Sequence, residues 1–108
     1  IAWDATFAAR YWEALQHQSP AALVAAIDAI LAMPKLTGRL ATIAMPTLVM
    51  VGDEDTAFIR LAHMYQDVIE DCTLIELAGG HDIVSDAPTA VSESIAGFAE
   101  RVAREELR

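Results

Sequence analysis

An apolar run near the middle of the chain restricts the possible folds more than any other feature of the sequence. Pro46 opens the run, residues 47–51 (Thr-Leu-Val-Met-Val) continue it, and Gly52 ends it. Polar and apolar residues do not alternate along it, as they would in a strand with one face in solvent. A strand that is apolar on both faces is typical of a parallel sheet covered by helices on both sides. The run therefore predicts an α/β fold built on a parallel sheet.

The residues after this run continue the same type of fold. Residues 58–70 place apolar side chains at helical spacing, and residues 73–77 form a second apolar run. Asp86 is expected to cap a last helix, with Pro88 in its first turn. That helix carries an apolar stripe formed by Val91, Ile95, Phe98 and Val102. The order strand, helix, strand, helix predicts a right-handed parallel crossover unit.

Two helices are predicted ahead of the apolar run. The first covers residues 4–16, and the second begins at the N-cap residue Ser19, with Pro20 at its first helical position. The second helix has one apolar stripe, formed by Leu23, Val24, Ile27, Ile30 and Leu31. Residues 35–45 are expected to form a connection in which Gly38 interrupts any helix.

The composition excludes several classes of protein. Of the 108 residues, 16 are Asp or Glu and 7 are Lys or Arg, which gives a net charge of −9. Nucleic acids and anionic membrane surfaces require a basic face, so neither is expected as a partner. The single cysteine, Cys72, excludes an intrachain disulfide and a zinc site with several thiolates. The longest apolar stretch, residues 21–33, contains Asp28 and is too short to span a bilayer.

The chain begins at Ile1 rather than at a methionine, and no signal-peptide pattern follows. We expect either that an N-terminal part has been removed or that the sequence is a segment of a longer protein. A cytoplasmic location is expected. The length fits one domain or part of one.

Acidic residues and a histidine follow the two predicted strands. Asp53, Glu54 and Asp55 come directly after the first strand, and His81 follows the second after two glycines. The carboxyl ends of parallel strands meet at one edge of a sheet, where ligands and catalytic groups gather. A carboxylate there can fix the tautomer of an imidazole and stabilise the imidazolium that forms. The same residues could instead form an Asx-turn, brace a loop or bind a divalent cation, although the cluster lacks the spacing of a calcium loop.

The sequence around both strands resembles the C-terminal part of an α/β-hydrolase. Residues 45–55 are similar to that family's proline-led strand followed by G-x-x-D. Residues 79–81 read Gly-Gly-His, and an acid and a proline follow at the family's spacing (Asp86 and Pro88). The resemblance covers residues 40–102.

The resemblance implies the roles of a catalytic acid and a catalytic base. Asp55 takes the position of the triad acid and His81 that of the general base. Asp53 and Glu54 occupy variable positions of the motif and receive no catalytic role. The implied activity is hydrolysis of a small ester, lactone, amide or carbon–carbon substrate, with no cofactor and no metal ion.

The nucleophile of the family is missing from this sequence. It would sit in a G-x-S-x-G turn between a strand and a helix, and no such motif occurs here. We therefore expect the nucleophile to lie outside this chain and the chain alone to be inactive. Residues 1–39 are expected to be the end of a helical cap and connecting helices. Residues 40–108 are expected to be the C-terminal strand–helix–strand–helix part of the core, two strands with flanking helices.

Three other functions fit the same residues. An aspartate-nucleophile epoxide hydrolase or dehalogenase would share the acid–histidine half of the site. A non-catalytic α/β interaction domain would use both residues to brace loops, and a small metal-binding domain would use them as ligands. Two strands are too few for an independently stable sheet. We therefore expect self-association, or a companion chain or segment that supplies the missing strands.

Overall fold

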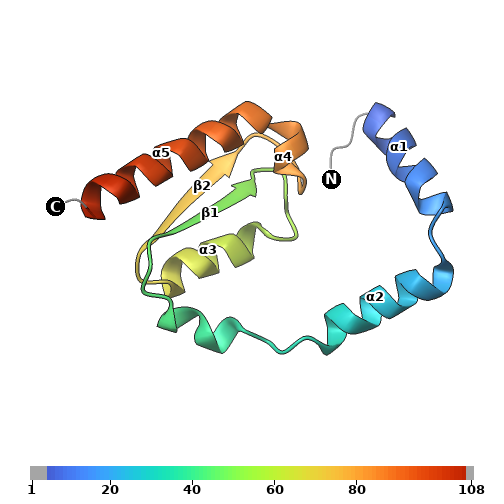
Figure 1. The fold of residues 1–108 in the computed structure, drawn as a ribbon, viewed down its shortest axis with the longest axis horizontal. Coiled ribbons are helices and arrows are strands. Elements are labelled where there is room, and N and C mark those ends of the chain that lie inside the picture. The colour runs from blue at the N-terminus through green and yellow to red at the C-terminus, as the bar shows by residue number, and fades with distance from the viewer. Residues whose placement is uncertain (1–4, 107–108) are drawn as a thin grey trace. The chain divides into compact units, whose positions relative to one another are not determined.

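The structure, a computed structural model, describes residues 5–106. Contacts divide these residues into two units, residues 5–38 and residues 39–106. The first unit holds helices α1 (Ala5–Gln16) and α2 (Pro20–Ala32), and the second holds the sheet and the remaining helices (Figure 1). Across the described part of the chain, no helix combines the length and the apolar character needed to cross a membrane.

The boundaries of α2 follow from the residues at its ends. The Ser19 side chain accepts a backbone N–H of the first turn at 3.3 Å, and Pro20 loses nothing there because the first N–H groups of a helix have no partner within it. Met33 leaves the helix in an extended conformation because a proline follows it. The helices predicted over 4–16 and from Ser19 are confirmed, except that Asp4 lies outside the described residues.

The apolar side chains of α2 are exposed to solvent. Five of them have exposed fractions between 38% and 78% (Leu23, Val24, Ile27, Ile30 and Leu31). Removing such surface from water is favourable by about 25 cal/mol per Å², so we expect the chain to self-associate or to bind a companion segment. Sedimentation velocity at micromolar concentration should show species larger than a monomer, and the double variant Ile27→Gln, Leu31→Gln should shift them toward the monomer. A monodisperse monomer of the unchanged chain would contradict this expectation.

A short 3₁₀ helix, η1 (Thr37–Thr42), crosses the connection before the sheet. The prediction that Gly38 interrupts any helix there was wrong. Each 3₁₀ turn is closed by a local bond that spans three residues, such as the bond from Ile43 N–H to the Leu40 carbonyl at 3.1 Å. One glycine therefore weakens such a short element too little to prevent it.

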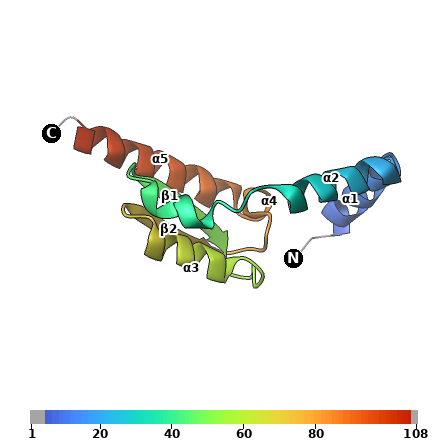
Figure 2. The same cartoon turned by 90° about the horizontal axis from the view of Figure 1, so that it is seen from below.

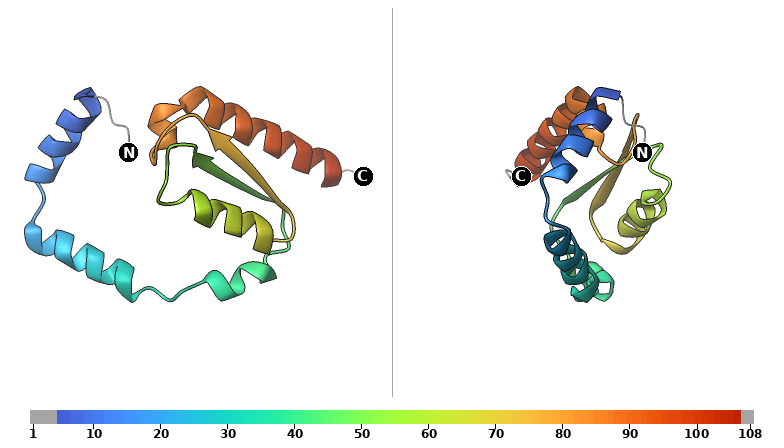
Figure 3. Two further views of the ribbon diagram at one scale, coloured as in Figure 1. Left: turned by 180° about the vertical axis from the view of Figure 1, so that it is seen from behind. Right: turned by 90° about the vertical axis from the view of Figure 1, so that its right-hand side faces the viewer.

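The sheet consists of two parallel strands, β1 (Thr47–Gly52) and β2 (Cys72–Leu77). They pair in register from their first residues to their last, so both strands end at the same level. Helix α3 (Ile59–Val68) covers one face of the sheet, and helix α5 (Pro88–Glu106) covers the other (Figures 2 and 3). The described chain is therefore a mixed α/β structure with a two-stranded parallel sheet, as the apolar runs predict.

Burial is concentrated where the strands approach the helices. The buried apolar side chains are Val51, Ala62, Ile69, Leu77 and Val91. The first four residues of β1 are only half-buried. Within the described residues β1 pairs with β2 alone, so its other edge is open. The predicted burial of this strand on both faces is thus complete only at its C-terminal end.

Two helix boundaries differ from the predicted ones. Helix α3 is shorter than residues 58–70 because Ile69 turns to an extended conformation and leads the chain toward β2. A separate short helix, α4 (Ile83–Asp86), precedes α5. The prediction that Asp86 caps the last helix was wrong, because its carboxylate accepts the backbone N–H of Gly80 instead, at 2.7 Å.

Candidate functional site

The loops that follow β1 and β2 are bonded to each other. Asp53 N–H donates to the Leu77 carbonyl at 2.7 Å, and Glu54 N–H donates to the Gly79 carbonyl at 2.9 Å. In return, Gly79 N–H donates to the Asp53 carboxylate at 3.1 Å. These bonds hold the residues after the two strands within contact distance.

This close approach requires glycine at two positions. A Cβ added at Gly52 would collide with the carbonyl oxygens of Gly79 and Gly80. Gly79 has a φ of +155°, which residues with a side chain rarely adopt, and a Cβ there would lie 2.7 Å from the Cβ of Asp86. Gly52, the last residue of β1, and Gly79, two residues after β2, therefore allow the two loops to touch.

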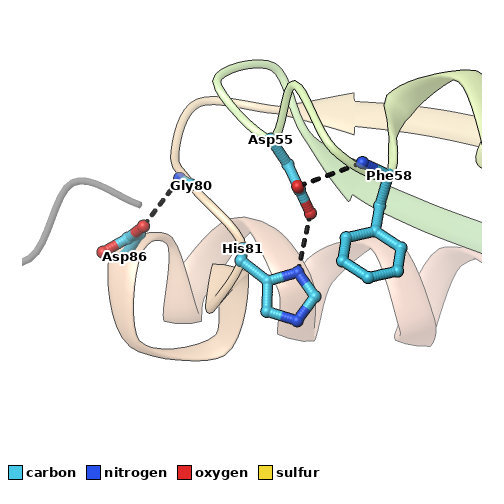
Figure 4. A network of polar contacts seen from close by, with 5 residues as sticks. All are labelled: Asp55, Phe58, Gly80, His81 and Asp86. Carbon is cyan, nitrogen blue, oxygen red and sulfur yellow. Dashed lines mark hydrogen bonds and ion pairs between the residues drawn. The ribbon is translucent and has the colours of Figure 1, made fainter. Parts of the chain in front are cut away.

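Asp55 is a buried carboxylate with two separate bonds. Its side chain is 7% exposed. Oδ1 accepts the backbone N–H of Phe58 at 3.3 Å, and Oδ2 lies 2.8 Å from Nδ1 of His81 (Figure 4). Its backbone also turns here, because the Asp55 carbonyl accepts N–H groups at the start of α3. The structure thus brings together the acid and the histidine that stand 26 residues apart in the sequence.

His81 presents its second ring nitrogen outward. Its side chain is 51% exposed. An ionised carboxylate can only accept a hydrogen bond, so Nδ1 carries the proton in the contact with Asp55, and in the neutral ring Nε2 then has a free lone pair. Within the described residues, Nε2 has no hydrogen-bond partner. A buried acceptor behind the ring and an open lone pair in front of it equip His81 to take a proton from a group that approaches from solvent.

An apolar cavity of about 270 Å³ lies beside this pair. Asp55 and His81 line it together with side chains of β1 and α3, which include Val49, Val51, Leu61, Ala62 and Tyr65. The pair therefore borders a surface that is largely apolar, where an electrostatic interaction is stronger than in bulk water.

Asp86 anchors the backbone that precedes His81. Its Oδ2 accepts the N–H of Gly80, the residue directly before the histidine. Asp86→Ala should remove this charge-assisted bond and destabilise the fold by about 1–2 kcal/mol. Asp86→Asn, which keeps a side-chain oxygen, should recover most of the loss. Urea denaturation checks both variants, and Asp82→Ala, which removes the two bonds from Ser85 to Asp82 and leaves the Gly80 bond intact, serves as the control. Equal losses for the alanine and asparagine variants would contradict the assignment.

The other acidic residues of the cluster do not gather around a common centre. Asp53 binds a loop amide, and the side chain of Glu54 is exposed. Among the residues that the structure describes, no group of three or more His, Cys, Asp or Glu side chains could hold a metal ion.

A second imidazole–carboxylate contact lies elsewhere on the surface. Nε2 of His63, on α3, is 2.7 Å from Oε1 of Glu76, on β2, and the two side chains are 52% and 43% exposed. Exposed pairs of this kind contribute little to stability. The two pairs differ in burial: the Asp55 carboxylate is buried, whereas the Glu76 carboxylate is exposed.

The thiol of Cys72 is not activated. Burial, and secondarily the neighbouring Asp71 carboxylate, raise the pKa of the Cys72 thiol above its ordinary value. Thiolate is the reactive form, and a raised pKa lowers its fraction at any given pH. Iodoacetamide should therefore alkylate Cys72 more slowly than it alkylates glutathione at pH 7.5, and the rate should rise only at more alkaline pH. A rate above that of glutathione at pH 7.5 would contradict this.

Sequence reasoning missed the part that Phe58 plays. Its ring stacks on the imidazole of His81, with 4.7 Å between ring centroids and 30° between ring planes. The bond from Phe58 N–H to Oδ1 of Asp55 spans three residues, so it is not the Asx-turn, which spans two, that the sequence left open for Asp55. The stacking carries no local sequence signal, because Phe58 and His81 meet only when the two strands pair.

The observed class of structure is a mixed α/β unit that carries a carboxylate–histidine pair at the carboxyl ends of two parallel strands. Comparisons with protein-family models, with curated protein sequences and with solved structures found no significant match to the chain. Support for a function therefore comes from the residues of the site and from the sequence motifs around them.

Proposed function

We propose that this chain supplies the acid, Asp55, and the general base, His81, of a hydrolase of the α/β-hydrolase type. The substrate is a small ester, lactone or amide, or a compound in which a carbon–carbon bond is cleaved. The nucleophile comes from residues outside Ile1–Arg108. One observation carries the proposal: a buried carboxylate bonds to Nδ1 of a half-exposed imidazole at 2.8 Å, which leaves Nε2 open. The motifs around residues 45–55 and 79–81 add their support.

The proposed reaction uses each nitrogen of His81 for a different task. Nε2 takes the proton of the attacking hydroxyl as its oxygen adds to the substrate carbonyl. Asp55 stabilises the imidazolium that results, through the bond to Nδ1. The imidazolium then returns the proton to the leaving group as the tetrahedral intermediate collapses. A water molecule, deprotonated by the same nitrogen, releases the acyl group and restores the nucleophile.

The nucleophile is assigned outside the chain because no residue that the structure describes fits that role. The sequence lacks a G-x-S-x-G turn. Within the described residues, no serine, threonine or cysteine side chain bonds to Nε2 of His81. We expect the 108-residue chain alone to hydrolyse esters at the background rate.

The proposed fold has further strands that pair with the open edge of β1. In this proposal, residues 40–108 are the C-terminal part of a larger parallel sheet, and residues 1–39 are the end of a helical cap with its connecting helices. Two features support it: β1 is apolar along its length, and β1 pairs on one side only within the described residues. Edge strands usually carry a charge or a proline, and β1 carries neither within its bounds.

The test compares the complete reading frame that contains this sequence with the 108-residue chain. A fluorophosphonate probe should label the product of the reading frame at a serine within a G-x-S-x-G turn, and the chain alone should remain unlabelled. The product of the reading frame should also hydrolyse p-nitrophenyl butyrate, and the chain alone should not do so above the background rate. If the probe does not label the protein but the protein hydrolyses an epoxide or a haloalkane, the nucleophile is an aspartate rather than a serine. A reading frame with neither activity would overturn the proposal.

A further inference from the structure

Phe58 contacts both members of the acid–histidine pair. Its backbone N–H donates to Oδ1 of Asp55 at 3.3 Å, and its ring stacks on the imidazole of His81 at 4.7 Å (Figure 4). Phe58 directly precedes α3, so the start of that helix fixes where the residue lies. One residue thus touches the carboxylate with its main chain and the imidazole with its side chain.

The two contacts restrict two different rotations. The bond to Oδ1 holds the Asp55 carboxylate so that Oδ2 faces the histidine. Within the described residues, the bond from Nδ1 to Oδ2 is the only hydrogen bond of the His81 side chain, and that side chain is half-exposed. A single bond leaves the ring free to tilt about it. The ring of Phe58, inclined by 30°, occupies one face of the imidazole and limits this tilt.

We propose that Phe58 is a positioning residue for His81. Its ring keeps Nδ1 aligned with Asp55 and directs Nε2 to the place where a nucleophile would approach. The consequence for turnover rests on the proposed function, whereas the alignment itself does not. Aromatic pairs of this kind correspond to a factor of roughly three to ten in an equilibrium, so we expect changes of that size rather than complete loss.

The alignment can be measured in the 108-residue chain without any activity. Magic-angle-spinning NMR with ¹⁵N-labelled histidine reads the tautomer of each imidazole and does not require a monomer. The chain has three histidines, so His17→Gln and His63→Gln variants assign the signals. In the unchanged chain His81 should be the Nδ1–H tautomer. Phe58→Leu, which keeps the backbone N–H, should lower the ratio of this tautomer to the other form three- to tenfold.

Two variants separate positioning from a general loss of structure. Phe58→Tyr keeps a ring on the imidazole and should restore the Nδ1–H tautomer. Phe98→Leu removes a ring that contacts Arg101 on α5 and should leave His81 unchanged. The proposal would be overturned if Phe58→Leu left the ratio of the His81 tautomers unchanged, or if Phe58→Tyr gave the same ratio as Phe58→Leu.

Activity of the complete reading frame distinguishes this inference from the proposed function. Phe58→Leu should lower kcat three- to tenfold with little change in KM, because the substrate still binds while the base is misaligned. A tautomer shift in Phe58→Leu together with full hydrolysis by His81→Ala would retain the positioning and reject the function. Loss of hydrolysis in His81→Ala with no effect of Phe58→Leu would retain the function and reject the positioning.

Discussion

His81→Ala should abolish hydrolysis by the complete reading frame, with kcat falling about 10⁶-fold, as it does when the base of a triad is removed. Within the described residues no second imidazole lies beside the buried carboxylate of Asp55, so none of them could take over the proton. Asp55→Asn should lower kcat about 10⁴-fold, since an amide turned toward Nδ1 favours the wrong imidazole tautomer. Initial rates with p-nitrophenyl butyrate measure both losses.

The matched control for this prediction is the surface pair. His63→Ala removes an imidazole that likewise contacts a carboxylate, at 2.7 Å, but that carboxylate is exposed. The variant should keep the full rate. Thermal unfolding followed by circular dichroism ensures that the His81 variant is folded, which is expected because its ring is half-exposed. Hydrolysis that survives in His81→Ala would instead support the non-catalytic interaction domain, in which Asp55 and His81 brace two loops.

Gly52→Ala should destabilise the 108-residue chain by about 3 kcal/mol or prevent it from folding. The added Cβ would overlap the carbonyl oxygens of Gly79 and Gly80, and both belong to the main chain, so no flexible side chain can move aside. The loops would have to separate, which breaks the bond from Glu54 N–H to Gly79 and moves His81 away from Asp55. Overpacking of this kind costs roughly 1–3 kcal/mol even where some relaxation is possible.

Gly97→Ala is the control for the same chemical change. Gly97 lies inside α5, and an added Cβ there would meet no heavy atom within 4 Å. Alanine is favoured over glycine in a helix by about 0.5–1 kcal/mol, so this variant should be more stable than the unchanged chain. Urea denaturation at one fixed protein concentration compares the two variants. A Gly52→Ala chain as stable as the Gly97→Ala chain would show that the loops do not approach as closely as described.

Much of the fold could be predicted because its signals are local. The apolar runs that became β1 and β2, the Ser19 cap of α2 and the helical spacing of the later segments each depend on residues close in sequence. The meeting of Asp55 and His81 could also be anticipated. Parallel strands end at one edge, so the residues directly after them become neighbours. That anticipation included a contact between the carboxylate and the imidazole, but it gave neither the burial of Asp55 nor the Phe58 amide that holds its second oxygen.

The errors and omissions arose where a residue has a choice of partners. Asp86 could cap a helix that follows it or bind the Gly80 amide behind it, and only the folded loop offers the second donor. Phe58 could be one more apolar residue of the helix predicted over residues 58–70, and only strand pairing brings the His81 ring against its ring.

By itself the sequence determined the order of helices and strands, because periodicity depends on residues close along the chain. It also indicated the pairing of acid with histidine across 26 residues, because parallel strands end at the same edge of a sheet. The tertiary structure alone decided which carboxylate is buried, which amides hold it and which ring supports the imidazole. Those features depend on side chains and backbone groups from distant segments, and they become neighbours only when the strands pair.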